Sequence, residues 1–243
     1  MMKTKTELSP WSPPQEPTQA QLRLAKALPY LVLASASPAR RMELANAGIT
    51  VAVRPTDADE QVSQTIPYEK VMAITRRKMD AYLMRAEHEL PVLTCDTMIA
   101  HNGKMIGKPT DRLDAYRQLK SFSGAAHEVY TGWALAFSSG TLRLSPRFRS
   151  ADKAHPQYFH EHRDASEIEI VWYYDYARVE FHPLSDQDIE TYLDCDEWKG
   201  AAGSYRIQGR GSSLVKSIHG DYATVVGLPI SMISGIVSDT AFC

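Results

Sequence analysis

The sequence predicts an α/β protein built on a mixed, twisted sheet with flanking helices. The apolar run 31–35 passes through a tight turn into a helix that ends near Gly48, and strands alternate with helices along the rest of the chain. The pair Asn102-Gly103 favours a hairpin between antiparallel strands, so the sheet is expected to be mixed.

The first part of the chain divides at about residue 28. Residues 1–28 are polar and Pro-rich, and we interpret them as a loosely held tail. After the strand at 31–35, Ser37 and Pro38 have the residue types of an N-cap and a first helical position. A second helix is predicted to begin at Pro67.

The middle of the chain predicts two further strands and a helix. The apolar run Pro91 to Asp96 is typical of a buried strand that ends in a carboxylate. Thr110 is expected to cap a helix that ends near Gly124, and a strand follows over 128–137.

Residues 138–170 interrupt this pattern. They are polar, rich in Arg and His, and without aliphatic periodicity, so we interpret them as an inserted loop or hairpin within one domain, 29–243. A strand is predicted over 170–181, and Ser185 with Asp188 resembles a capping box. A final helix is expected after Pro229.

Composition excludes several classes of protein. Charged residues make up 23% of the 243 residues and the formal net charge is -2, which does not favour a nucleic-acid-coating protein. The cysteine count is odd and no CxxC spacing occurs, which argues against a disulfide framework and favours a reducing, cytoplasmic compartment. No apolar run is long enough to span a bilayer, and we expect no membrane partner.

The segment SASPARR, residues 35–41, is the strongest local signal for a binding site. A strand that turns into a helix directs free N–H groups and the helix dipole at the turn, which suits a phosphate group. Ser35 and Ser37 can donate hydroxyl hydrogen bonds, and Arg40 can clamp phosphate oxygens. An ordinary N-cap followed by two solvated arginines is the slightly favoured alternative for this segment alone.

Other segments offer metal ligands or cations. Asp96, at the end of an apolar strand, could hold a divalent metal or take a proton from water, or could be a turn residue. The cluster Asp57, Asp59 and Glu60 has hard ligands suited to magnesium or manganese, although a charged surface loop is the better interpretation in isolation. Lys108, between Gly and Pro, could present its ammonium to phosphate or be a plain turn residue.

Common nucleotide-binding and zinc motifs are missing from the sequence. There is no GxxxxGK[ST] loop, no strand-borne GxGxxG and no HExxH. The histidines at 155, 160 and 162 lie close together, but no cysteine supports them, so a solvated loop is favoured over a zinc site.

Six blocks together resemble the Maf family of septum-formation-inhibitor-like nucleotide pyrophosphatases. In order, they are LASASPARR, DADE, CDTMIAHNGKMIGKP, SFSGAAHEVYTG, GAAGSYRIQGRG and VVGLPI, and they span about residues 31–236. The resemblance implies an α/β fold similar to that of inosine triphosphate pyrophosphatases, with two lobes around a cleft. It leaves out the tail and the insertion.

The resemblance also implies roles for individual residues. Asp96 matches the family's catalytic aspartate, and with Glu60 it would hold a Mg²⁺ or Mn²⁺ ion. The residues that would bind a nucleoside triphosphate are Ser35, Ser37, Arg40, Lys78, Lys108 and Gln208.

The implied reaction is hydrolysis of a nucleoside triphosphate to the monophosphate and pyrophosphate, a house-cleaning step of nucleotide metabolism. The YxIQG and CDT patterns resemble members that act on dTTP and UTP, but Ala39 stands where the family often has arginine. A modified nucleotide is therefore a further candidate substrate. A non-catalytic regulator of septum formation and a phosphomonoesterase stay open, as does a homodimer.

Overall fold

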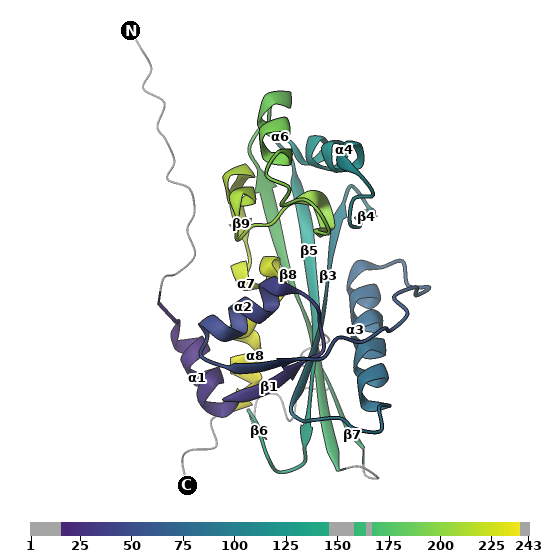
Figure 1. Ribbon diagram of the computed structural model, residues 1–243, viewed down its shortest axis with the longest axis vertical. Helices are drawn as coiled ribbons and strands as arrows, with labels where there is room; N and C mark the ends of the chain where they lie inside the picture. The colour runs from purple at the N-terminus through teal and green to yellow at the C-terminus, as the bar shows by residue number, and fades with distance from the viewer. Residues whose placement is uncertain (1–15, 146–157, 164–166, 239–243) are drawn as a thin grey trace.

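Three long strands run through the molecule and carry its other elements (Figure 1). They are β3 (Val92–His101), β5 (Ala126–Ser138) and β8 (Ile168–Phe181), which pair antiparallel to one another. The computed structural model describes residues 16–145, 158–163 and 167–238.

The sheet is mixed, as the sequence predicts. Its order is β2-β1-β3-β5-β8-β7, with β4 paired to β3 and β9 to β8. Among the described strands, β1 alone pairs in parallel, with β2 and β3. A small antiparallel pair joins β6 to β10. The shorter strands are β1 (Tyr30–Leu33), β2 (Thr50–Val53), β4 (Lys104–Ile106), β6 (Arg143–Leu144), β7 (Tyr158–Arg163), β9 (Val215–His219) and β10 (Val237–Ser238).

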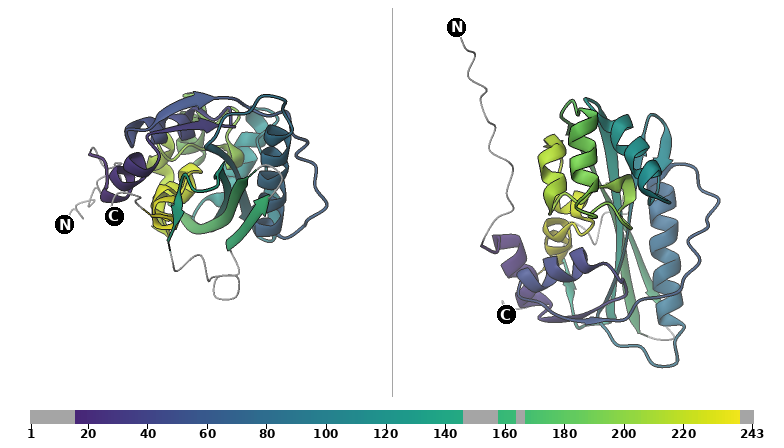
Figure 2. Two further views of the ribbon diagram at one scale, coloured as in Figure 1. Left: turned by 90° about the horizontal axis from the view of Figure 1, so that it is seen from below. Right: turned by 45° about the horizontal axis from the view of Figure 1, so that its top comes forward.

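Helices cover the sheet in two lobes. In the lower lobe, α3 packs on one face of the long strands, and α1, α2 and α8 lie on the other side (Figures 1 and 2). In the upper lobe, α4 and α6 pack over the far ends of the same strands. The helices are α1 (Gln19–Ala27), α2 (Pro38–Asn46), α3 (Pro67–Leu83), α4 (Arg112–Phe122), α6 (Asp186–Leu193), α7 (Tyr222–Val226) and α8 (Ile230–Ile236).

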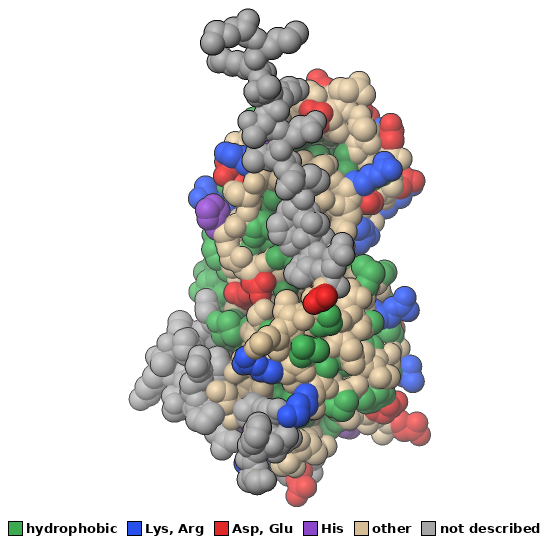
Figure 3. All heavy atoms as spheres, turned by 90° about the vertical axis from the view of Figure 1, so that its left-hand side faces the viewer, with side chains coloured by type: hydrophobic (Ala, Val, Ile, Leu, Met, Phe, Trp, Pro, Cys, Tyr) green, Lys and Arg blue, Asp and Glu red, His purple; other side chains and the backbone are tan. Residues whose placement is uncertain are grey.

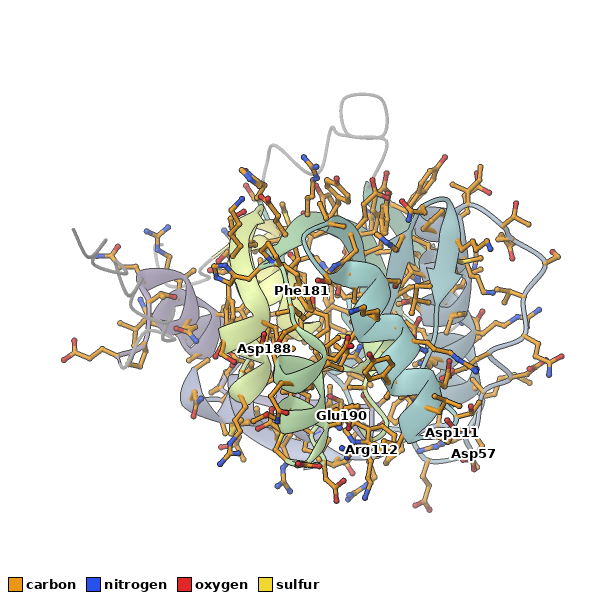
Figure 4. All side chains as sticks on the ribbon, turned by 90° about the horizontal axis from the view of Figure 1, so that it is seen from above. Asp57, Asp111, Arg112, Phe181, Asp188 and Glu190 are labelled. Carbon is orange, nitrogen blue, oxygen red and sulfur yellow. The ribbon has the colours of Figure 1, made fainter. Side chains whose placement is uncertain are left out.

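Because side chains alternate along the strands, the described residues form three apolar cores. Leu93 and Cys95 face the core beneath α1, α2 and α8, whereas Val92 faces α3. The upper lobe has its own core around Phe122 and Phe181. Arg112 of α4 donates to Glu190 of α6 at 2.7 Å across the outside of that lobe, where Figure 4 shows the two side by side.

Several predicted local signals are confirmed. Asn102 and Gly103 both have positive φ, 49° and 72°, as the hairpin between β3 and β4 requires. Ser185 and Asp188 form both hydrogen bonds of a capping box at α6. The N-cap of α2 is Ser37, with Pro38 at the first helical position.

The tail prediction was wrong for residues 19–27, which form α1. Thr18 and Gln21 make a complete capping box, a signal that the interpretation of a polar tail overlooked. Leu24 and Leu28 are buried, and α1 packs against α8. Residues 1–15 lie outside the described residues.

Two boundaries also differ from the predictions. The N-cap of α4 is Asp111, whose carboxylate accepts from the backbone N–H of Asp114 at 2.8 Å, and not Thr110. Strand β3 does not end at Asp96, because pairing with β5 continues to Ala100 and pairing with β4 continues to His101. Asp96 itself lies opposite Gly132 in mid-strand.

The segment 138–170 is partly a strand of the sheet. Strand β7 pairs with β8 over Tyr158–Arg163, so the predicted hairpin alternative fits this part. Arg163 donates to Asp80 of α3 at 2.6 Å, and Arg76 of α3 pairs with Glu161 at 3.3 Å. The insertion therefore contacts a helix of the lower lobe. Residues 146–157, including His155, and 164–166 lie outside the described part.

The surface is of mixed charge where it is in view. On the face shown in Figure 3, Lys and Arg side chains are interspersed with Asp and Glu. Within the described residues, no helix is long and apolar enough to cross a membrane.

Candidate active site

A cleft opens where strand β3 lacks a neighbour on one side. Strand β1 pairs with β3 only to Leu93, and β4 pairs with it only from Ile99. Between these points the strand edge faces a cleft of about 620 Å³. Its walls come from the turn between β1 and α2, from α3, from β4, from the loop before β9 and from the end of α7. The cleft therefore lies between the two lobes.

All the predicted site residues line this one cleft. The chain segments that carry them are far apart in sequence, and the fold brings them together. They are Ser35, Ser37, Arg40, Glu60, Lys78, Asp96, Lys108 and Gln208.

The centre of the cleft is a charged triad. The Lys78 ammonium contacts Asp96 Oδ1 at 2.7 Å and Glu60 Oε1 at 2.8 Å. Lys78 and Asp96 are 12% and 14% exposed, whereas Glu60 is 56% exposed. Helix α3 directs Lys78 at the strand, and the loop after β2 brings Glu60 over it. One cation therefore holds two carboxylates at the free edge of β3.

The pKa values of the two carboxyl groups are shifted in opposite directions. Burial raises the pKa of Asp96 above its ordinary value, although the Lys78 ammonium opposes the rise. Burial also acts to raise the pKa of Glu60, but the hydrogen bond and charge of Lys78 outweigh it, so that pKa is lowered. Similar groups at one site thus have different proton affinities because Asp96 is the more deeply buried.

Arg40 makes more hydrogen bonds within the protein than a phosphate clamp, the role predicted from the sequence, would need. Its guanidinium donates to Gly227 O, Ser35 Oγ, Cys95 O and Thr97 Oγ1 at 2.9 to 3.0 Å. The side chain has five N–H donors, and these four bonds leave one on Nη2. Arg40 is only 8% exposed. It therefore ties the turn, β3 and the end of α7 together beneath the cleft.

Gly227 shows how closely this arrangement is packed. It has φ of 97°, a left-handed conformation that favours glycine. A Cβ there would lie 2.6 Å from Thr97 Oγ1 and 3.4 Å from Arg40 Nε. Only glycine can present its carbonyl to Arg40 from this position.

The other predicted residues have mixed roles. Ser37 Oγ accepts from the backbone N–H of Arg40 as the cap of α2, and Ser35 Oγ accepts from Arg40, so both hydroxyls also serve the turn. Lys108 is exposed at the cleft, and Gln208 is half-buried there.

The remaining acidic and histidine candidates lie elsewhere. Asp57 is exposed on the outside of the molecule (Figure 4), and Asp59 pairs with Arg77 at 3.7 Å. Of that acidic cluster, only Glu60 lines the cleft. His160 and His162 are on β7 and do not line it.

Sequence reasoning missed several residues of the cleft. Lys70 lies two turns before Lys78 on α3, with Ile74 between them on the same helical face, a spacing that could have indicated it. Tyr205 and Val225 also line the cleft, and both pack with the upper core. Both lie in family blocks, GAAGSYRIQGRG and VVGLPI, but their place in the cleft depends on how those segments fold over β3.

The carboxylates fit a hard divalent cation held jointly with a substrate. Mg²⁺ commonly takes one or two carboxylates and completes its shell with phosphate oxygens and water. Asp96 and Glu60 converge on one ammonium, so both carboxylates are directed at the same part of the cleft. Within the described residues, no group of three or more His, Cys, Asp or Glu forms a protein-only metal site. This donor set fits a metal that arrives with phosphate.

These features define an α/β protein whose interlobe cleft suits a phosphate ester and a divalent cation. The chain belongs to the Maf family, because the model of that family, described as Maf-like protein, matches residues 30–239. It is 33% identical over 208 residues to the dTTP/UTP pyrophosphatase of Pyrococcus furiosus, covering 85% of this chain and 93% of that protein. It is 34% identical over 215 residues to the dTTP/UTP pyrophosphatase of Bdellovibrio bacteriovorus, covering 86% and 98%.

Proposed function

We propose that this protein is a nucleoside triphosphate pyrophosphatase that hydrolyses the bond between the α and β phosphates. Water is consumed, and a nucleoside monophosphate and pyrophosphate are released. The observation that carries the proposal is the triad of Lys78, Asp96 and Glu60 in a cleft lined by further cations. Relatives that match most of the chain are named dTTP/UTP pyrophosphatase, so dTTP and UTP are the first substrates to test, followed by modified nucleotides.

Charge neutralisation and positioning supply most of the catalysis in this proposal. Phosphoryl transfer needs little covalent help, so the groups that hold the phosphates in place matter most. We assign Lys108 and Lys78, which line the cleft, to the polyphosphate, together with the remaining N–H of Arg40 and the backbone N–H groups at the start of α2. Ser35 and Ser37 shape that turn.

Asp96 is the group we assign to the attacking water. Its carboxylate lies at the free edge of β3, where it orients the water and accepts its proton as the bond to the leaving pyrophosphate breaks. Lys78 keeps Asp96 and Glu60 in place. Asp96 and Glu60 would hold a Mg²⁺ or Mn²⁺ ion, which when bound neutralises phosphate charge and polarises the phosphorus centre.

We assign Gln208 to recognition of the nucleobase. Its amide supplies both a donor and an acceptor, which suits a pyrimidine edge, and it lines the cleft in the loop before β9. Free Cys95 and Cys195 are consistent with a reducing cytoplasm, which we propose as the location. A homodimer remains a prediction, for which light scattering on the purified protein is the test.

A screen of unmodified and modified nucleoside triphosphates with separate detection of pyrophosphate and orthophosphate tests the proposed reaction. Pyrophosphate is expected, with activity lost to a chelator and restored by Mg²⁺ or Mn²⁺. Orthophosphate alone would indicate a phosphomonoesterase. Binding with no product would favour a non-catalytic regulator of cell division on the same fold.

The substitution Asp96→Asn tests whether Asp96 is the general base. The amide keeps the size of the side chain and removes its charge and basicity, so turnover should fall by about 10²–10⁴-fold while nucleotide still binds. Pyrophosphate release and Tm are measured on the same preparation. Normal turnover in the folded variant would remove Asp96 from the mechanism.

A further inference from the structure

A buried histidine lies directly behind one wall of the cleft. His127 of β5 is 1% exposed, and its Nε2 is 2.8 Å from the hydroxyl oxygen of Tyr205. Phe122 stacks on its ring at 4.3 Å, and Phe181, labelled in Figure 4, meets it edge-on at 5.1 Å. The histidine belongs to the block SFSGAAHEVYTG, and the proposed reaction assigns it no role.

Tyr205 connects this histidine to the cleft. The residue lines the cleft, yet its side chain is buried and its ring packs edge-on against Phe181 at 5.0 Å. The bond to His127 anchors the phenol at its far end. Gln208, three residues later in the same loop, also lines the cleft. An anchored tyrosine therefore fixes the start of the loop that presents Gln208.

The imidazole is suited to a neutral hydrogen bond. Burial, with a smaller contribution from His101, lowers the pKa of His127 to about 3. The ring is therefore uncharged at neutral pH. Its Nε2 and the Tyr205 hydroxyl form one hydrogen bond, in which one of these two atoms is the donor and the other the acceptor. A neutral pair of this kind fixes geometry without adding charge to the cleft.

The two ends of the cleft differ in chemistry. Lys78, Asp96 and Glu60 lie at the polar end, beside the turn that begins α2. Tyr205 lines the cleft too, but it belongs to the apolar core of the upper lobe. An apolar wall next to an amide suits a nucleobase, whereas the charged end suits phosphates.

We infer that His127 is a positioning residue that holds Tyr205 in place and thereby sets the affinity of the cleft for the nucleoside part of its ligand. The inference deepens the proposed function and rests on it. It makes a specific distinction: loss of the bond should weaken binding of a nucleoside monophosphate and leave binding of inorganic pyrophosphate unchanged.

Calorimetric binding of thymidine monophosphate and of inorganic pyrophosphate, each to the full-length protein with Mg²⁺, tests this distinction. The variants are His127→Phe, which keeps a packed ring without the bond, His127→Gln, which can restore it, and Tyr205→Phe. His127→Phe and Tyr205→Phe should each raise the Kd of the monophosphate about five- to tenfold, the value of one neutral hydrogen bond. His127→Gln should recover at least half of that loss on a logarithmic scale.

A double-mutant cycle separates positioning from general damage. If His127 acts through Tyr205, the double variant should bind thymidine monophosphate no more weakly than either single variant. His101→Asn is the matched control, because His101 is also buried against Phe122 but does not contact the cleft. This control variant should lower Tm. Both of its Kd values should stay within about twofold of the wild type, because substitutions at sites that do not interact change one another's free energies only by small amounts.

Two results would overturn the inference. One is an equal loss of affinity for the monophosphate and pyrophosphate, and the other is an additive double variant. Both would mean that His127 supports only the fold. Failure of the proposed function is separately visible, since the wild type would then release no pyrophosphate in the screen while the calorimetric comparison could still be made. In steady state, the variants should raise KM and change kcat little.

Discussion

Replacing Arg40 with alanine should destabilise the whole protein as well as impair catalysis. A surface arginine that only clamps phosphate could be removed with little effect on folding. Arg40 instead makes four hydrogen bonds to four different residues, and two of the acceptors are the buried carbonyls of Cys95 and Gly227. Arg40→Ala leaves both carbonyls without the donor that satisfies them.

The size of the effect follows from those two acceptors. A buried polar group left unsatisfied costs about 1–3 kcal/mol, so two carbonyls cost about 2–6 kcal/mol. The hydroxyls of Ser35 and Thr97 can turn to other partners, and Thr97 already has Thr131 at 3.0 Å. For a chain of this size, 1 kcal/mol shifts Tm by about 2–4 °C, so a fall of about 4–24 °C is expected.

Thermal unfolding and steady-state kinetics on the same preparations measure the effect. Arg41→Ala is the matched control, because Arg41 is the next residue on α2 and its side chain is exposed. That variant should have a Tm within about 2 °C of the wild type, as expected for a surface substitution. Arg40→Ala should show both the lower Tm and a large loss of kcat/KM.

An Arg40→Ala variant with an unchanged Tm would refute this reasoning. Such a result would mean that water or a shift of the backbone satisfies Cys95 and Gly227 without cost. A large kinetic loss with normal stability would then return Arg40 to the role of a simple phosphate clamp.

Three further predictions concern other parts of the molecule. Arg163→Ala should lower Tm by about 1–4 °C, because a partly exposed ion pair to Asp80 is worth up to about 1 kcal/mol, and an unchanged Tm would show that β7 does not brace α3. Because Lys70 lines the cleft, Lys70→Met should raise KM for a nucleoside triphosphate about threefold to tenfold, whereas Lys70→Arg should keep a KM near that of the wild type. Equal KM values for the two variants would place Lys70 outside the site. Between about pH 3 and 6.5, His127 is protonated in the unfolded chain and neutral in the folded chain. The stability that the neutral His127 contributes is therefore complete above about pH 6.5 and is lost as pH falls, by up to about 1.4 kcal/mol per pH unit. Urea unfolding of His127→Gln should show a shallower pH dependence than the wild type, and identical slopes would contradict the low pKa.

Local chemistry allowed much of the fold to be predicted from the sequence. The turn from β1 into α2, the Asn102-Gly103 hairpin and the capping box at Ser185 depend on residues within a few positions of one another. Helix α1 was not predicted although its capping box is equally local, because the prolines before it are typical of a loosely held tail. The mid-strand position of Asp96 was missed because the run after it is less apolar and is held by pairing with β5.

The sequence by itself determined eight of the residues that line the cleft, because the turn at Ser35 and the carboxylate of Asp96 occur in family blocks whose order survives in this chain, and Lys78 matches a lysine on the helix between two of those blocks. Only the tertiary structure decided what those residues contact. The donors of Arg40 reach acceptors 55 and 187 positions away, and His127 meets Tyr205 across 78 positions. Hydrogen bonds between distant segments depend on the packing of whole strands and helices, and no local pattern encodes their partners.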